Sequence, residues 1–216
     1  MIVDFERQNV LHSRPLSDET STSGLKLLIY MQHYGIPTRL LDWTNNPFIA
    51  LYFALSTAKK NDAGVYTEDA AVWVLDPVKW NSVSLSQQSH GDEGPMDIGE
   101  AATNYGPRKV FHGKLEPSAL NQMLEGPAAI LGISNNARMF AQRGVFTIFG
   151  KNVAPMEEQY VSGGFASGVL VKLVIPKEKI EVMLERLLKI GYTDSVSYPD
   201  LHGLALEIKR MRGFGV

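Results

Sequence analysis

The sequence predicts an α+β fold, and three observations carry this prediction. Short apolar runs rich in β-branched residues indicate strands, of which Gly168–Ile175 (GVLVKLVI) is the clearest. Longer segments with apolar side chains at a helical spacing indicate helices. Strands and helices do not alternate regularly, as they would in a doubly wound fold. We therefore expect a mixed or antiparallel sheet with flanking helices.

The first half of the chain contains two expected helices and a strand. Residues 24–34 (GLKLLIYMQHY) have a helical apolar pattern that a following glycine and proline end. A second helix is expected from Pro47 to about Lys59, because Asn45 or Asn46 can cap it and proline suits its first turn. The run Ala70–Leu75 (AAVWVL), followed by Asp-Pro, predicts a buried strand.

The second half opens with residues 81–108, which are polar and dotted with glycine and proline. We expect a long loop or insertion there, with a short helix near Ile98–Thr103; its composition does not choose between a functional lid and a disordered segment. The elements expected after it are a short apolar run at Ala128–Ile133, a helix over Asn135–Gln142, strands at Val145–Phe149 and Gly168–Ile175, an amphipathic helix over Lys177–Ile190 and a last helix over Leu201–Met211.

Composition bounds the function. With 216 residues, 44% hydrophobic and 20% charged, the chain predicts one globular domain over 1–216. The absence of cysteine excludes disulfides, a thiolate nucleophile and cysteine-ligated metal centres. A net charge of −2 gives no overall attraction to nucleic acid or anionic lipid. The longest nearly uncharged run, Asn45–Ala58, is too short to cross a bilayer, and the N-terminus lacks a secretion signal. We therefore expect a cytoplasmic protein without a membrane partner.

Motif searches exclude several common sites. No phosphate-binding loop, dinucleotide-binding glycine pattern or nucleophile elbow is present. The histidines show no paired spacing of four residues, so no metal is expected; they lie at positions 12, 33, 90, 112 and 202.

The densest group of functional side chains lies in Met31–Thr44 (MQHYGIPTRLLDWT). Polar groups gathered at a helix end and a short loop are typical of a ligand site. A structural interpretation stays open beside it: Arg39 pairs with Asp42, Trp43 fills the core and His33 bonds a backbone carbonyl. On the first interpretation, the ligand-binding candidates of this segment are His33, Tyr34, Thr38, Arg39, Asp42 and Trp43.

Three blocks of sequence resemble the FRG domain family. They are QHYGIPTRLLDWTNNPFIALYFA at 32–54, AQRGVFTIF at 141–149 and YPDLHGLALEI at 198–208. The resemblance spans about residues 25–210. The Phe-Arg-Gly motif that names the family is expected upstream of the first block and is absent; DFERQN at 4–9 is similar to the stretch that follows it. The chain is thus either an N-terminally truncated member or a divergent one.

The resemblance implies a bacterial and phage-associated module without an assigned activity. Its order of motifs is similar to the layout of ADP-ribosyltransferases, in which an arginine holds the NAD diphosphate, a strand Ser or Thr braces the nicotinamide and a later acid orients the ribose. By that similarity Thr44 takes the strand hydroxyl and Gln142 the acid position. Because glutamine cannot ionise, it can orient a ribose hydroxyl but cannot act as a general base.

The same similarity implies NAD as the cofactor and a protein or nucleic acid as the acceptor. Arg39 is the arginine of the first block that can hold a diphosphate, and Trp43 or Tyr34 can stack on a ring of the nucleotide. Arg143 and Asp200 join the ligand-binding candidates, although a helix N-cap is the default role of an aspartate after proline.

Three function classes remain open. The first is an NAD-dependent ADP-ribosyltransferase-like enzyme. The second is a module that binds a nucleotide or nucleic acid without turnover. The third is a structural or interaction domain whose signature residues only hold the fold. The sequence does not give the oligomeric state.

Overall fold

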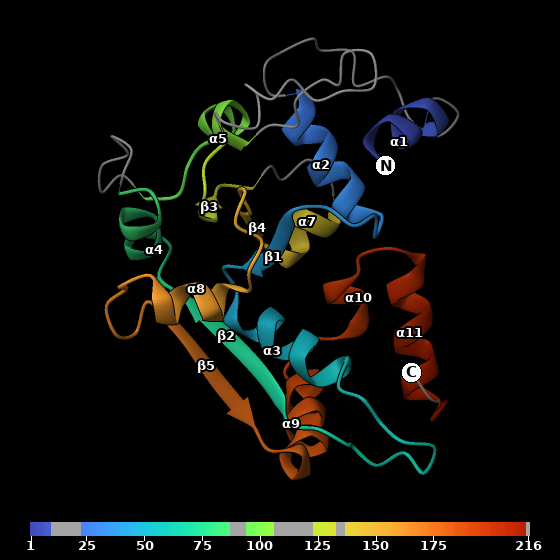
Figure 1. The fold of residues 1–216 in the computed structure, drawn as a ribbon. Coiled ribbons are helices and arrows are strands. Elements are labelled where there is room, and N and C mark those ends of the chain that lie inside the picture. The colour runs from blue at the N-terminus through green and yellow to red at the C-terminus, as the bar shows by residue number, and fades with distance from the viewer. Residues whose placement is uncertain (10–22, 87–93, 106–122, 133–136, 215–216) are drawn as a thin grey trace. The chain divides into compact units, whose positions relative to one another are not determined.

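The computed structural model describes residues 1–9, 23–86, 94–105, 123–132 and 137–214 (Figure 1). The chain forms two compact units, each made of three segments, and each is described here by itself. Unit 1 comprises Met1–Asp42, Pro77–Ile133 and Phe146–Ala166, and unit 2 comprises Trp43–Asp76, Ser134–Val145 and Ser167–Val216.

Unit 1 contains helices and a small sheet. Its helices are α1 (Ile2–Asn9), α2 (Ser23–His33), α4 (Pro77–Ser84), α5 (Ile98–Tyr105) and α8 (Met156–Ser162). The sheet has the order β1-β4-β3, formed by β1 (Leu40–Thr44), β4 (Gly144–Ile148) and β3 (Ala128–Ile130). The boundary between the units falls inside β1 and inside β4.

Both pairings of this sheet are antiparallel. In one, Ala128 of β3 lies opposite Ile148 of β4. Beside the ends of β1 and β4, the Phe149 N–H donates to Arg39 O (2.9 Å) and the Asn45 N–H donates to Arg143 O (3.2 Å). The residue before β1 thus pairs with the residue after β4, and the residue after β1 pairs with the residue before β4. This pairing requires that β1 and β4 run antiparallel.

The core of unit 1 joins α4 to β3 through two buried side chains. Trp80 stacks on Phe165, with ring centroids 4.3 Å apart, and its indole N–H donates to Pro127 O (2.8 Å). Asn81 bonds Ala129 twice, because its Nδ2 donates to Ala129 O (2.9 Å) and its Oδ1 accepts from Ala129 N (2.8 Å). These bonds satisfy backbone groups of β3 that its short ladder leaves open.

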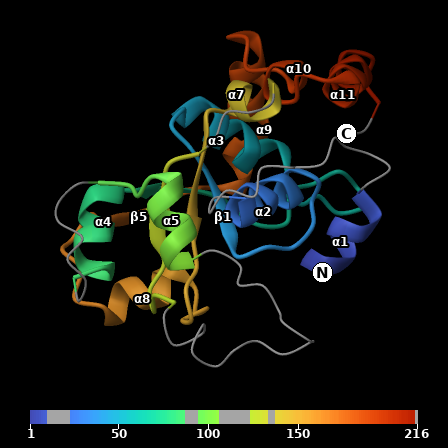
Figure 2. The same cartoon turned by 90° about the horizontal axis from the view of Figure 1, so that it is seen from above.

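Unit 2 is built on a two-stranded antiparallel sheet of β2 (Ala70–Leu75) and β5 (Leu170–Ile175), with Ala70 opposite Ile175. The helices α3 (Pro47–Ser56) and α9 (Lys177–Lys189) lie side by side in both views (Figures 1 and 2). Their buried cluster with the sheet consists of Tyr52, Leu55, Tyr66, Ala70, Ile175, Ile180, Leu184 and Leu187.

The remaining helices of unit 2 are α7 (Ala137–Gln142), α10 (Asp194–Ser197) and α11 (Leu201–Met211). The N-cap of α11 is Asp200, whose Oδ1 accepts from Gly203 N (3.0 Å). A Cβ at Gly203 would collide with the carbonyl oxygen of Tyr198, so glycine is what lets α11 lie against the preceding turn.

These elements confirm the α+β prediction. The expected helices and strands of both halves are present with bounds shifted by a few residues, and Asn46 rather than Asn45 caps α3. The segment 81–108 contains more helix than expected, because residues 81–84 complete α4 and 98–105 form α5. Residues 87–93 and 106–108 of that segment, like 133–136 of the region around α7, lie outside the described residues.

Candidate functional site

Thr44 and Gln142, the two residues to which the resemblance assigns catalysis, meet in unit 2. Thr44 ends β1, and its hydroxyl donates to the backbone oxygen of Gln142 at the end of α7 (2.6 Å). The same oxygen atom of Thr44 accepts from Asn46 N (3.0 Å), the N-cap of α3. Thr44 therefore links the first two sequence blocks through one hydroxyl, and it contacts the backbone of Gln142 rather than the amide.

The side chain of Gln142 connects the second block to the third. Its Nε2 donates to the backbone oxygen of Ser197 at the end of α10 (2.9 Å), and the side chain is half-buried. Ser197 is buried, and its hydroxyl has no hydrogen-bond partner among the described residues. The three blocks, far apart in sequence, are thus joined in unit 2 by Thr44 and Gln142.

Arg143 follows Gln142 and has an unusual backbone. Its φ is +48°. Among the described residues, no other residue except glycine has a positive φ. Its backbone oxygen accepts from Asn45 N (3.2 Å), and its N–H donates to Phe140 O (3.2 Å). A left-handed backbone conformation is uncommon for a residue with a long side chain, and surrounding contacts are needed to hold it. The side chain is exposed, and its guanidinium makes no hydrogen bond or ion pair within the described ranges.

The region around Tyr198 places further charged groups in unit 2. The guanidinium of Arg138, on α7, lies 4.5 Å from the centroid of the Tyr198 ring. His202 packs edge-on against the same ring, with centroids 5.9 Å apart. Asp200 is exposed, and the backbone N–H of Gly203 lowers the pKa of its carboxylate. Asp200 therefore acts as the helix N-cap that its sequence position predicts.

In unit 1, Gln32 joins two of the predicted ligand residues. The hydroxyl of Thr38 donates to Gln32 Oε1 (2.6 Å), and Gln32 Nε2 donates to Asp42 Oδ2 (2.9 Å). Thr38 Oγ1 also accepts from Leu40 N (3.0 Å). These bonds hold the start of β1 against the end of α2.

His33 and Tyr34 lie at the C-terminal end of α2, as expected. Their rings pack edge-on with centroids 4.9 Å apart, and Tyr34 makes the same kind of contact with Tyr30. Tyr34 is 62% exposed, so one side of this aromatic group faces solvent.

Arg39 is bonded to backbone oxygen atoms of unit 1. Its Nη1 donates to Phe149 O (2.8 Å), and its Nη2 donates to Tyr105 O. The Nη1 group also lies 3.2 Å from the sulfur of Met123. Burial lowers the pKa of the guanidinium. Arg39, to which the resemblance assigned the diphosphate, thus donates to the backbone oxygen just after β4 and to that of the last residue of α5.

The predicted site residues divide between the two units. Unit 1 holds His33, Tyr34, Thr38, Arg39 and Asp42, and unit 2 holds Trp43, Thr44, Gln142, Arg143 and Asp200. Trp43 is half-buried in β1 beside Thr44. Within unit 2, contacts bring Thr44, Gln142 and Arg143 together. The catalytic and ligand-binding roles of these residues stay predictions.

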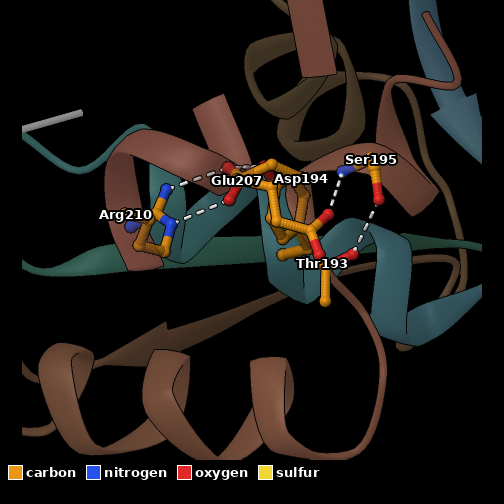
Figure 3. Close-up of polar contacts among 6 residues, drawn as sticks. Thr193, Asp194, Ser195, Glu207 and Arg210 are labelled. Carbon is orange, nitrogen blue, oxygen red and sulfur yellow. Dashed lines mark hydrogen bonds and ion pairs between the residues drawn. The ribbon is translucent and has the colours of Figure 1, made fainter. Parts of the chain in front are cut away.

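A buried polar cluster in unit 2 was not expected from the sequence (Figure 3). The side chain of Asp194 is 1% exposed and receives two bonds from Arg210, from Nε at 2.8 Å and Nη2 at 3.0 Å. The Tyr52 hydroxyl donates to the same carboxylate (2.6 Å). Burial by itself would raise the pKa of Asp194, but the bonds from Arg210 and Tyr52 outweigh it and lower the pKa.

A second carboxylate extends this cluster. Glu207 Oε2 accepts from Ser195 N (3.0 Å), and the Ser195 and Thr193 hydroxyls lie 3.2 Å apart (Figure 3). Asp194 and Ser195 belong to α10, and their partners Arg210 and Glu207 belong to α11, so the cluster fixes α10 to α11. No sequence signal marks it, because Asp194 and Arg210 are sixteen residues apart and Arg210 lies in a basic helix end.

One family model matches part of the chain. The family model of the FRG domain matches residues 1–63, which confirms the family resemblance of the first block. No curated protein and no solved structure matches the chain. Among the described residues, no helix has the length and apolar character to span a membrane, and no three His, Asp or Glu side chains gather as metal ligands.

Proposed function

We propose that this FRG-domain protein binds a nucleotide, with NAD as the first candidate, on the surface of unit 2 where Thr44, Gln142 and Arg143 meet. The observation that carries the proposal is Arg143: an exposed arginine on a left-handed backbone, with a guanidinium that no described residue engages. Strained backbone of this kind is concentrated at functional sites.

The chemistry of Arg143 favours an anionic ligand. A guanidinium offers donors in a planar fork that match two phosphate oxygens at once. Arg138, five residues earlier and at the Tyr198 ring, adds a second positive charge in the same unit. A diphosphate between two nucleosides supplies the charge that such groups bind, and Trp43, beside Thr44, is the ring that can stack on a base.

Thr44 and Gln142 are positioning residues in this proposal. The Thr44 hydroxyl fixes the backbone oxygen of Gln142, and the neighbouring Asn45 N–H fixes that of Arg143. The strained backbone is therefore held from β1.

Binding without turnover is the activity that this arrangement supports best. ADP-ribosyl transfer breaks the glycosidic bond of NAD, nicotinamide leaves with the bonding electrons, and an acceptor nucleophile takes the ribose carbon. Gln142 cannot accept a proton from that acceptor, since an amide does not ionise. Transfer to a protein or nucleic acid remains a second candidate, favoured by the proximity of Thr44 and Gln142, the two residues to which the transferase layout gives roles.

Calorimetric titration with NAD and with ADP-ribose tests the proposal, and nicotinamide release is followed in parallel by chromatography. Arg143→Ala is expected to weaken binding at least tenfold. Arg143→Gly is expected to weaken it equally while raising stability by up to about 1 kcal/mol, because glycine relieves the positive φ. The matched control is Arg186→Ala, an exposed arginine on α9. Equal affinities for Arg143→Ala and the control, or no binding at millimolar ligand, would contradict nucleotide binding, and released nicotinamide would establish turnover.

A further inference from the structure

The C-terminal helix α11 has most of its large apolar side chains on the outer face. Four of them, spaced by three, four and three residues, are exposed: Leu201 (83%), Leu204 (47%), Ile208 (51%) and Met211 (78%). This spacing is that of the a and d positions of two heptads, which form one stripe along a helix. We call these four residues the α11 stripe.

The inner face of α11 is mostly polar, although it also includes the half-buried Leu206. Gly203 packs on Tyr198, Glu207 bonds Ser195, and Arg210 bonds the buried Asp194. A surface helix normally turns its apolar face to the core and its charged face to water. In α11 most of the large apolar side chains face outward instead, and specific hydrogen bonds fix this orientation. The stripe is therefore held outward, which is the arrangement of a helix that contacts a partner.

We propose that the α11 stripe pairs with the α11 stripe of a second copy of this chain, antiparallel and about a two-fold axis. The spacing of three, four and three reads the same from both ends. In an antiparallel pair Leu201 therefore faces Met211 of the second copy, and Leu204 faces Ile208. A surface that is complementary to itself under a two-fold rotation is the requirement for a symmetric dimer.

The charges at the two ends of α11 favour the antiparallel direction. Asp200 is exposed at the N-terminal end, and Arg212 is exposed just beyond the C-terminal end. Antiparallel pairing brings Asp200 of one copy near Arg212 of the other at both ends. It also sets the helix dipoles against each other favourably. Parallel pairing would instead place the basic ends of both helices, Lys209 to Arg212, side by side.

The size of the contact sets the expected strength. An 11-residue helix is about 16 Å long, so the pair buries less than the roughly 1,200 Å² of a stable specific interface. The dimer is accordingly weak, with a dissociation constant in the micromolar range or above. Sedimentation velocity over protein concentrations from about 5 µM to 1 mM is expected to show reversible association of the full chain.

Polar substitution in the stripe tests whether this face is the contact. Leu204→Asp and Ile208→Asp are each expected to weaken association at least tenfold with no change in the urea midpoint, because both side chains are about half exposed. Val161→Asp, at an 85% exposed position on α8, is the matched control and should leave association unchanged. A chain that stays monomeric at 1 mM, or one in which the stripe variants lose stability instead of association, overturns the proposal.

The absence of cysteine in the chain allows a clean test of direction. A mixture of Leu201→Cys and Met211→Cys chains is expected to form a disulfide-linked dimer, because the two positions face each other. Either variant alone should not, since like positions then lie ten residues, or about 15 Å, apart along the pair, beyond the reach of a disulfide. A cross-link in Leu201→Cys alone, or none in the mixture, overturns the antiparallel pairing.

Discussion

Arg39 belongs to the first sequence block, and its side chain is bonded within the fold. Its guanidinium donates to the backbone oxygens of Phe149 and Tyr105 in unit 1. A buried carbonyl oxygen that loses its charged donor stays out of contact with water and has no hydrogen bond to compensate, which destabilises the folded state. Arg39→Ala is therefore expected to lower the free energy of unfolding by about 2–3 kcal/mol, measured by urea denaturation.

The control for Arg39 is an arginine that is exposed at the surface. Arg186 is exposed on α9, and its replacement by alanine should change stability by less than about 0.5 kcal/mol. If the two variants were equally stable, Arg39 would be available to a ligand, and its assignment to a diphosphate would gain support over its role in the fold.

Residue roles were predictable where local chemistry fixes them. Asp200 after proline and before a helical pattern predicts an N-cap, and the structure confirms it. The left-handed backbone of Arg143 carries no such signal, since glycine and asparagine are the residues that usually adopt it. The role of Thr44 as a link to Gln142 depends on a contact across ninety-eight residues, which no local pattern encodes.

At the scale of elements, the seating of α11 depends on Gly203. Alanine is favoured over glycine inside a helix by about 1 kcal/mol. At this position, however, a Cβ would collide with the backbone of Tyr198. Gly203→Ala is therefore expected to destabilise the chain by about 1–3 kcal/mol, in spite of the higher helix propensity of alanine. The urea midpoint and the near-ultraviolet circular dichroism of the nearby Tyr198 are the measurements.

A second helical glycine provides the comparison for Gly203. In α5, a Cβ at Gly99 would approach only the carboxylate end of Asp97, at 3.2 Å, which can move aside. Gly99→Ala should change stability by less than about 1 kcal/mol. Equal effects of the two substitutions would show that the contact with Tyr198 is not close enough to require glycine.

Elements with a long periodic pattern were predicted well, whereas the shortest helix, α10, was not. The pattern of α9 spans thirteen residues and begins after a proline, so the spacing of apolar residues predicts this helix. By contrast, α10 has four residues and depends on Asp194 being bonded by Arg210 and Tyr52. Its formation is a tertiary effect, and a single sequence read locally contains no sign of it.

For the whole molecule, the sequence predicted the class of fold but not its division. The density of polar side chains in the first block predicts one site, yet Asp42 belongs to unit 1 and Trp43 to unit 2. The strands β1 and β4 each cross this boundary, so the motif residues on either side serve different cores. Hydrophobic periodicity identifies strands but does not state which core each end of a strand joins.

The stability of the whole chain is expected to depend on pH through carboxylates whose pKa values are lowered. Arg210 and Tyr52 outweigh burial at Asp194, hydrogen bonding by Ser195 lowers the pKa of Glu207, and the Gly203 N–H does so for Asp200. A lowered pKa in the folded state means that the unfolded chain binds protons first as pH falls. This stabilisation is complete above about pH 5, where unfolded carboxylates are ionised, and is lost as pH falls through the folded pKa values.

Asp194→Asn separates the buried carboxylate from the others. It leaves Arg210 without its counter-charge, so the variant should lose roughly 3 kcal/mol at pH 7. Because asparagine does not titrate, the further loss between pH 5 and pH 3 should be smaller in the variant than in the wild type. Urea midpoints at pH 7, 5 and 3 measure both effects, with Glu178→Gln, an exposed position on α9, as control. An unchanged acid sensitivity in Asp194→Asn would assign the pH dependence to the exposed carboxylates and leave the buried ion pair with a role in packing alone.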